Sequence, residues 1–192
     1  MKILGIVGSP RKEGNTEIMM REALEAARQA GAETEMVLVA DSDIAPCDGC
    51  MACMEGDGCV IDDDMQAIYE KLELADGIIF GTPVYFINVS AQAKAIIDRT
   101  LVMLRNGKLK GKVAAAIVVA RRVGAGQVLG LLYTWFAAQR MITAGGGIGY
   151  GREKGEVREG PGGTPMLSAL EEARSVGRNV VGMVKKVSKG SG

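Results

Sequence analysis

Apolar positions along the chain follow two different periods in turn, and this alternation predicts strands separated by helices. Short apolar runs bounded by turn residues are typical of buried strands. They occupy Lys2–Val7, Glu33–Ala40, Gly77–Thr82 and Lys112–Ala120, and a short fifth strand begins at Arg140–Thr143. The fourth run is almost entirely apolar, which predicts a strand covered on both faces.

Helical spacing of apolar residues fills the stretches between these strands. The predicted helices are Thr16–Ala30, a helix from Asp63 to about Ala75, Ala91–Leu104, Gln127–Gln139 and Pro165–Val187. Ser90 is expected to cap the third helix, and Asp63 with Gln66 three residues later has the spacing of a capping box.

Alternation of strands and helices predicts a parallel sheet with helices on both faces. Right-handed crossovers and the chain length favour a flavodoxin-like three-layer α/β sandwich with five parallel strands in the order 2-1-3-4-5. We expect one domain over residues 1–192, with a cysteine-rich insertion at about 41–62. Ligands of such sheets bind at the carboxyl ends of the strands, which places the site after residues 7, 82 and 120.

Composition removes several functions. Hydrophobic residues make up 47% of the chain, so a disordered protein is excluded. The 23 basic and 23 acidic residues balance, which argues against nucleic acid or a membrane as partner. Absence of histidine excludes Ser-His-Asp and Cys-His catalysis. The N-terminal apolar run is too short for a signal peptide and no apolar stretch reaches about 18 residues, so we expect a cytoplasmic protein without disulfides.

The loop after the first strand suits a phosphate group. It runs as GSPRKEGNT into a helix N-terminus, whose free N–H groups and dipole favour an anion. The candidate ligands are Ser9, Arg11, Gly14, Asn15 and Thr16. The loop has neither the Walker A nor the GxGxxG pattern. The alternative is an ordinary turn in which Asn15 or Thr16 caps the helix.

Loops after the third and fourth strands complete the candidate site. Pro83, Val84, Tyr85 and Phe86 offer a stiff loop and two rings for a flat cofactor, although the two rings equally suit the core under the next helix. Ala120 and Arg121 end the fourth strand, and Arg121 with Arg122 faces either a ligand, another subunit or solvent. The glycine-rich stretch 144–164 is expected to be a mobile lid, an interface loop or disordered.

All four cysteines fall in one short segment with the spacing C-x2-C-x2-C-x5-C. Cys47, Cys50, Cys53 and Cys59 fit the ligand set of a [4Fe–4S] cluster. Zinc is the main alternative, although structural zinc sites usually use two separated cysteine pairs. A third possibility is that the thiols act as a redox switch or have no role.

Taken together, these motifs resemble the iron–sulfur flavoprotein family, a branch of the NADPH-dependent FMN reductase-like proteins with a flavodoxin fold. The resemblance rests on GSPRKEGNT (8–16), CDGCMACMEGDGC (47–59), TPVYFINVSAQAKAIIDR (82–99) and GGGIGYG (145–151). It implies FMN held at its phosphate by 8–16 and at its ring by 82–86, a [4Fe–4S] cluster on the four cysteines, and a homodimer or homotetramer that brings the cluster of one subunit near the FMN of another.

The resulting hypothesis is a flavin-dependent oxidoreductase that relays electrons. A ferredoxin-like one-electron donor reduces the cluster, the flavin stores the electrons, and oxygen, peroxide or a quinone accepts them. Two alternatives stay open: an NAD(P)H-dependent FMN or quinone reductase whose cysteine segment is not essential, and a redox-sensing protein whose oxidised segment changes partner binding.

Overall fold

A five-stranded parallel sheet forms the centre of the protein. The computed structural model describes residues 1–56, 58–158 and 168–190. The strand order is β2 (Glu33–Leu38), β1 (Lys2–Val7), β3 (Gly77–Pro83), β4 (Val113–Ala120) and β5 (Ile142–Tyr150), with every neighbouring pair parallel. The predicted strand order 2-1-3-4-5 is confirmed.

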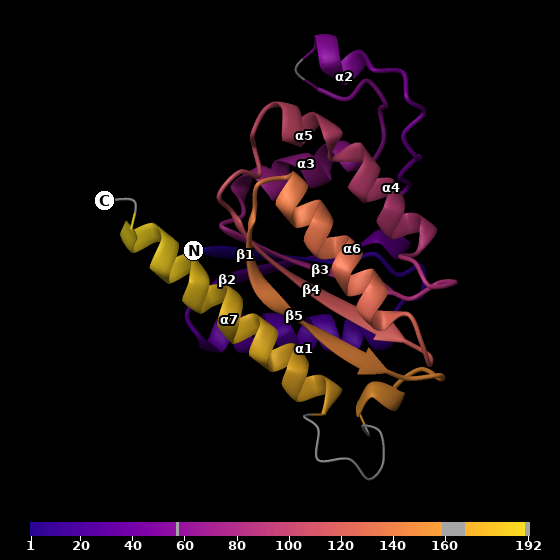
Figure 1. Cartoon of the computed structure of the whole chain (residues 1–192), viewed down its shortest axis with the longest axis vertical. Helices are drawn as coiled ribbons and strands as arrows, with labels where there is room; N and C mark the ends of the chain where they lie inside the picture. Colours follow the sequence, from indigo (N-terminus) through magenta and orange to yellow (C-terminus); the bar gives the residue numbers. More distant parts are fainter. Residues whose placement is uncertain (57, 159–167, 191–192) are drawn as a thin grey trace.

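Helices cover the sheet on both faces (Figure 1). On one face lie α1 (Asn15–Gln29) and α7 (Ala169–Gly190), packed over a core that includes Ile3, Met19 and Ile79. On the other lie α3 (Met65–Leu74), α4 (Ala91–Arg99), α5 (Leu101–Arg105) and α6 (Ala125–Ala138), over a core that includes Phe80, Phe136 and Ile96. The sheet is therefore buried on both faces, as a parallel sheet must be.

Three local predictions are wrong, and each has a physical reason. Strand β5 extends to Tyr150, so the first part of the predicted glycine-rich loop is a strand paired with β4. Glycines suit this strand because a Cβ at Gly146 would lie 2.7 Å from Leu129 Cδ1, and one at Gly149 would lie 2.4 Å from Met19 Sδ. Residues 159–167, which include the predicted start of the last helix at Pro165, lie outside the described residues.

The third predicted helix is divided at Thr100 into α4 and α5. The side chain of Gln139 donates to both the carbonyl and the hydroxyl oxygen of Thr100, at 2.9 and 3.0 Å, and Trp135 Nε1 donates to the same hydroxyl at 3.1 Å. These tertiary bonds hold the irregular residue in place. The predicted cap at Ser90 is present, because its hydroxyl accepts the backbone N–H of Ala93 at 3.1 Å.

The capping box at Asp63 is the third error. The residue before α3 is Asp64, and the box forms only in half. The Asp63 carboxylate accepts the backbone N–H of Met65 at 3.0 Å and also forms an ion pair with Arg99, but Gln66 donates to the carbonyl groups of Cys59 and Ile61 and not back to Asp63. These contacts hold the segment that follows β2. It contains two short helices that the sequence did not predict, η1 (Val39–Asp41) and α2 (Ala52–Glu55), and its α2 end projects away from the sheet (Figure 1).

Among the described residues, every helix is too short or too polar to cross a membrane.

Candidate functional site

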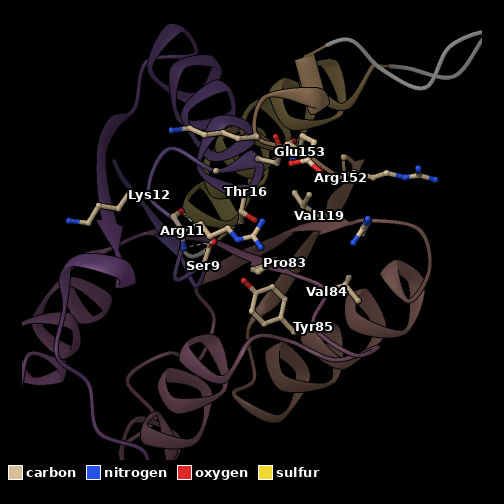
Figure 2. A pocket seen from close by; sticks show the side chains of 15 residues that line it. Ser9, Arg11, Lys12, Thr16, Pro83, Val84, Tyr85, Val119, Arg152 and Glu153 are labelled. Atoms are coloured by element: carbon tan, nitrogen blue, oxygen red, sulfur yellow. Dashed lines mark hydrogen bonds between the residues drawn. The ribbon is translucent and has the colours of Figure 1, made fainter.

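A cavity of about 430 Å³ opens at the carboxyl ends of β1, β3 and β4, where the strand order reverses (Figure 2). It brings together nine of the eleven residues predicted to hold a cofactor: Ser9, Arg11, Gly14, Asn15, Thr16, Pro83, Val84, Tyr85 and Arg121. Phe86 and Ala120 do not line it. Sequence reasoning missed six further lining residues: Lys12, Val119, Gly151, Arg152, Glu153 and Lys154.

The N-terminus of α1 borders the cavity without a side-chain cap. Its N-cap residue is Gly14, and neither Asn15 nor Thr16 caps the helix, so that alternative is wrong. The buried carboxylate of Glu17 accepts the backbone N–H of Glu13 at 2.6 Å and thereby holds the approach to the helix. The first-turn N–H groups therefore remain for an anionic ligand, with the buried side chains of Ser9 and Thr16 beside them.

The side chain of Asn15 joins two loops of the site. Its Nδ2 donates to the carbonyl of Glu153 at 2.8 Å, and its Oδ1 accepts the N–H of Gly155 at 2.7 Å. An ion pair of 2.6 Å between Lys154 and Glu13 makes a second link. Asn15 thus fixes the segment after β5 against the start of α1, and its amide is used on the protein itself. Nothing in the sequence indicated this link, because the two loops are more than a hundred residues apart.

The loop after β3 ends in a tight, exposed turn. The backbone N–H groups of Tyr85 and Asn88 each bond to the other residue's carbonyl, at 2.8 and 3.1 Å. Between them Phe86 and Ile87 have φ values of 46° and 65°, which bulky and β-branched residues rarely adopt. Tyr85 is 39% exposed and Phe86 fully exposed, so the alternative that they fill the core is wrong.

Positive charge dominates the lining of the cavity. Five basic side chains line it against one acidic residue, Glu153; they are Arg11, Lys12, Arg121, Arg152 and Lys154. Lys12 pairs with Asp41 and Lys154 with Glu13. In the part of the chain that the structure describes, the three arginines form no salt bridge. The cavity therefore suits a ligand with more than one negative charge. Arg122 is exposed and does not line it.

The four cysteines carry free thiols. Cys47 and Cys50 are exposed, and Cys53 and Cys59 are partly buried against the core. Among the described residues, no three cysteine or carboxylate side chains lie close enough to hold a metal ion. The donor set nevertheless fits an iron–sulfur cluster in its chemistry, because four thiols on one segment are the ligands that such a cluster takes.

Both ends of the cysteine segment are tied down by Arg99 and Asp63. The Arg99 guanidinium binds the carboxylate of Asp63 at 2.7 and 3.0 Å and the carbonyl of Ala45 at 2.9 Å. Asp63 in turn accepts the N–H of Ala45 at 2.9 Å. Burial raises the pKa of Asp63, but Arg99 and the backbone N–H groups outweigh burial and hold that pKa below its usual range. Between these two ends, around α2, Arg105 donates to the carbonyl groups of Cys53 and Gly56.

Residues 1–153 match the family model described as NADPH-dependent FMN reductase. An iron–sulfur flavoprotein of Methanocaldococcus jannaschii is 39% identical, over 98% of this chain and 100% of its own length. One from Methanosarcina thermophila is 45% identical, over 79% of this chain and 81% of its own. The chain belongs to the iron–sulfur flavoprotein branch of this family. Membership confirms the resemblance and the prediction of a flavin-dependent oxidoreductase.

Solved structures agree with the fold of this iron–sulfur flavoprotein family member. A flavone reductase superposes with a TM-score of 0.78 at 21% identity; the match covers 98% of this chain and 64% of that one. A WrbA-like flavodoxin from Agrobacterium tumefaciens gives a TM-score of 0.64 at 16% identity, with 96% and 97% coverage. At such identities the likeness establishes the flavodoxin-like fold alone.

Proposed function

We propose that the protein relays electrons from a ferredoxin-like one-electron donor, through a [4Fe–4S] cluster on Cys47, Cys50, Cys53 and Cys59, to FMN and on to oxygen, peroxide or a quinone. The observation that carries the proposal is the meeting of the uncapped N-terminus of α1 with the loop after β3 in one cavity. When bound, the two cofactors supply one-electron and two-electron chemistry, and the protein supplies position and charge.

For FMN, the phosphate would lie at the N-terminus of α1. The first-turn N–H groups, the buried hydroxyls of Ser9 and Thr16 and the charge of Arg11 are suited to a phosphate dianion. Pro83, Val84 and Tyr85 would border the ring. The cavity has a single helix N-terminus, which suits the one phosphate of FMN better than the two of FAD.

For the cluster, the fit is one of ligand chemistry. Four free thiols lie within thirteen residues, from Cys47 to Cys59. Cys53 and Cys59 pack against the core and Cys47 and Cys50 are exposed, so the exposed pair would approach the packed pair to hold iron. Zinc would use the same thiolates, and metal analysis of protein purified without oxygen distinguishes the two.

We also propose a homodimer or homotetramer, supported by complementary charge. Between Arg28 and Lys71 the sequence has eleven acidic residues and no basic one, whereas five basic side chains line the cavity. Exposed apolar side chains occur in both regions: Met51, Met54 and Val60 on the cysteine segment, and Phe86 and Ile87 beside the cavity. The cysteine segment of one subunit would then cover the cavity mouth of another. Sedimentation of a monomer with both cofactors at micromolar concentration would disprove this.

The decisive experiment uses protein purified anaerobically. Iron, sulfide and heat-released flavin are measured on one sample, together with its visible spectrum. The proposal expects four irons and one FMN per chain, and stopped-flow reduction by ferredoxin in the order cluster, then flavin. FAD, zinc or flavin without iron in fresh protein would overturn it.

A second function is favoured by the family description, which names NADPH as donor. In that case NADPH would reduce the flavin directly. A Cys50→Ala variant that lacks iron and is reduced by NADPH as fast as wild type would favour this reading over the relay.

A further inference from the structure

Arg99 is a buried cation that lies at the base of the cysteine segment. It is the last residue of α4, and its side chain is 0% exposed. Its terminal nitrogens bond to Asp63 and to the carbonyl oxygens of Ala45 and Ile61, the last at 3.3 Å. Ala45 and Ile61 lie two residues outside Cys47 and Cys59, and Asp63 lies four residues after Cys59. We call residues 45 and 61–63 the neck of the segment.

A buried charge is costly, so all its donors are expected to be used. Arg99 departs from this rule in one atom, because its buried Nε has no hydrogen-bond acceptor within the described part of the chain. The two terminal nitrogens of the guanidinium donate to Asp63 and to the carbonyl groups of Ala45 and Ile61. The backbone carbonyl of Arg99 accepts the hydroxyl of the buried Tyr69 at 2.8 Å. One N–H of the guanidinium therefore remains for another acceptor.

Cys59 lies within the electrostatic reach of this arginine. Burial lowers the pKa of Arg99, but Asp63, Tyr69 and Cys59 outweigh burial and raise it. Burial is also the main cause that raises the pKa of Tyr69 to about 12, with Cys59 as a smaller contribution. The Arg99 guanidinium also binds the carbonyl of Ile61, two residues beyond Cys59, so this metal-ligand candidate lies near the buried positive charge.

We propose that Arg99 is a positioning residue for the metal site: it closes the neck so that Cys47 and Cys59 stay near one another, and its charge makes the bound cluster easier to reduce. The inference rests on the proposed function, because it requires a cluster on the four cysteines. Neither the motif nor the family assignment gives this arginine a role.

Two physical effects support the proposal. Bringing the ends of a loop together costs entropy, and a neck already closed by hydrogen bonds removes that cost from cluster binding. Reduction adds a negative charge to the cluster, so a nearby buried cation, and an N–H available to a sulfur, favour the reduced state. The first effect needs the forked guanidinium, whereas the second needs only the charge.

Substitutions at both members of the pair separate these effects. Arg99→Lys keeps the charge without the fork, Arg99→Gln removes the charge, and Asp63→Asn removes the opposite charge. Because Arg99→Gln leaves a carboxylate buried alone, the double variant Arg99→Gln with Asp63→Asn provides a neutral pair. Arg105→Gln is the matched control, since Arg105 also bonds to carbonyl groups of this segment but is exposed.

Each variant is purified anaerobically, and iron, FMN, the midpoint potential of the cluster and its rate of loss to a chelator are measured. We expect Arg99→Lys to lose the cluster at least several-fold faster than wild type, with a near-normal potential. Arg99→Gln lowers the potential, Asp63→Asn raises it, and the double variant lies between them. Arg105→Gln removes an exposed charge that solvent screens, so it shifts the potential less than Arg99→Gln does, and FMN content stays near one per chain throughout.

Equal potentials in wild type, Asp63→Asn and the double variant, or a wild-type rate of cluster loss in Arg99→Lys, would overturn the role of Arg99 and leave the relay intact. A wild type without iron and sulfide would overturn the proposed function, and this inference with it. The two failures are therefore distinguishable from the wild-type sample alone.

Discussion

Gly177→Ala tests how closely helices α1 and α7 pack beneath the sheet. A Cβ at position 177 would lie 2.0 Å from the carbonyl oxygen of Ala23, 2.9 Å from its carbonyl carbon and 3.1 Å from the backbone nitrogen of Ala27. All three are backbone atoms of α1, so no side-chain rotation relieves the overlap. An ordinary contact begins at 3.4 Å, which requires the helices to separate by about 1.4 Å at this point.

Separation on this scale disturbs a core that is otherwise closed. Ala23 and Ala27 are fully buried, and Val176 and Val180 flank the glycine on the same face of α7. Overpacking typically costs about 1–3 kcal/mol, and rigid backbone neighbours place this site at or above the upper limit. Alanine recovers about 0.5–1 kcal/mol through helix propensity. The expected net loss in free energy of unfolding is about 2–3 kcal/mol.

Gly182→Ala is the matched control. It makes the same change in the same helix, and nothing lies within 4 Å of the added Cβ. We expect it to stabilise the protein by about 0.5–1 kcal/mol. We expect the free energies of unfolding of the two variants to differ by about 3 kcal/mol. Urea titration at saturating flavin, monitored by far-ultraviolet circular dichroism, measures this difference. Equal stability of the two variants would refute the close packing.

Three further predictions concern the site. Cys50→Ala should lose iron yet keep FMN near full occupancy, since no residue is shared between the cysteine segment and the cavity lining; analysis of iron and flavin on one sample checks this, and loss of both would show that the sites depend on each other. Arg11→Ala and Thr16→Val should each weaken FMN binding by about 1–3 kcal/mol without unfolding the protein, as measured by flavin fluorescence titration. The folded-state pKa of Asp63 lies below the ordinary value of 3.8, so its stabilising effect is complete above pH 3.8 and is lost as the pH falls through the lowered value. Acid titration should therefore show a flatter loss of stability over this range in Asp63→Asn than in wild type, and identical acid profiles would contradict the ion pair.

The strand order and the cavity could be predicted because local signals and general rules pointed to the same answer. Apolar runs such as Val113–Ala120 identify buried strands, right-handed crossovers restrict the topology, and parallel sheets bind ligands where the order reverses. The loops that follow β1 and β3 must therefore lie together at that edge, because both strands are parallel neighbours in the sheet. Strand β5 could not be predicted in the same way, because its glycines are typical of turns. They are required in this strand because Leu129 and Met19 pack too close to leave room for a Cβ.

Contacts between distant residues could not be predicted from local signals. Asp63 has the spacing of a helix cap and does accept the N–H of Met65, but its carboxylate also binds a buried arginine 36 residues later, which local spacing did not indicate. Asn15 likewise is a residue type that caps helices or binds phosphate, yet its side chain donates to the backbone carbonyl of Glu153, 138 residues away. In each case a polar side chain with several acceptors or donors had more than one suitable partner, and only the folded chain decides between them.

The net charge of zero says little about binding partners, because it is the sum of an acidic region and a basic region of the chain. Absence of basic residues from 29 to 70 is offset by cations elsewhere, five of which line one cavity. Screening limits exposed charges to a range of about 8–10 Å, so a binding partner responds to the local surface and not to the total. A net charge of zero therefore excludes neither an acidic docking surface on the cysteine segment nor an anion in the cavity. The same reasoning underlies the inference for Arg99: a buried cation in the neck is screened less than the exposed acidic residues around the segment, so it would act more strongly on a cluster held by the four cysteines.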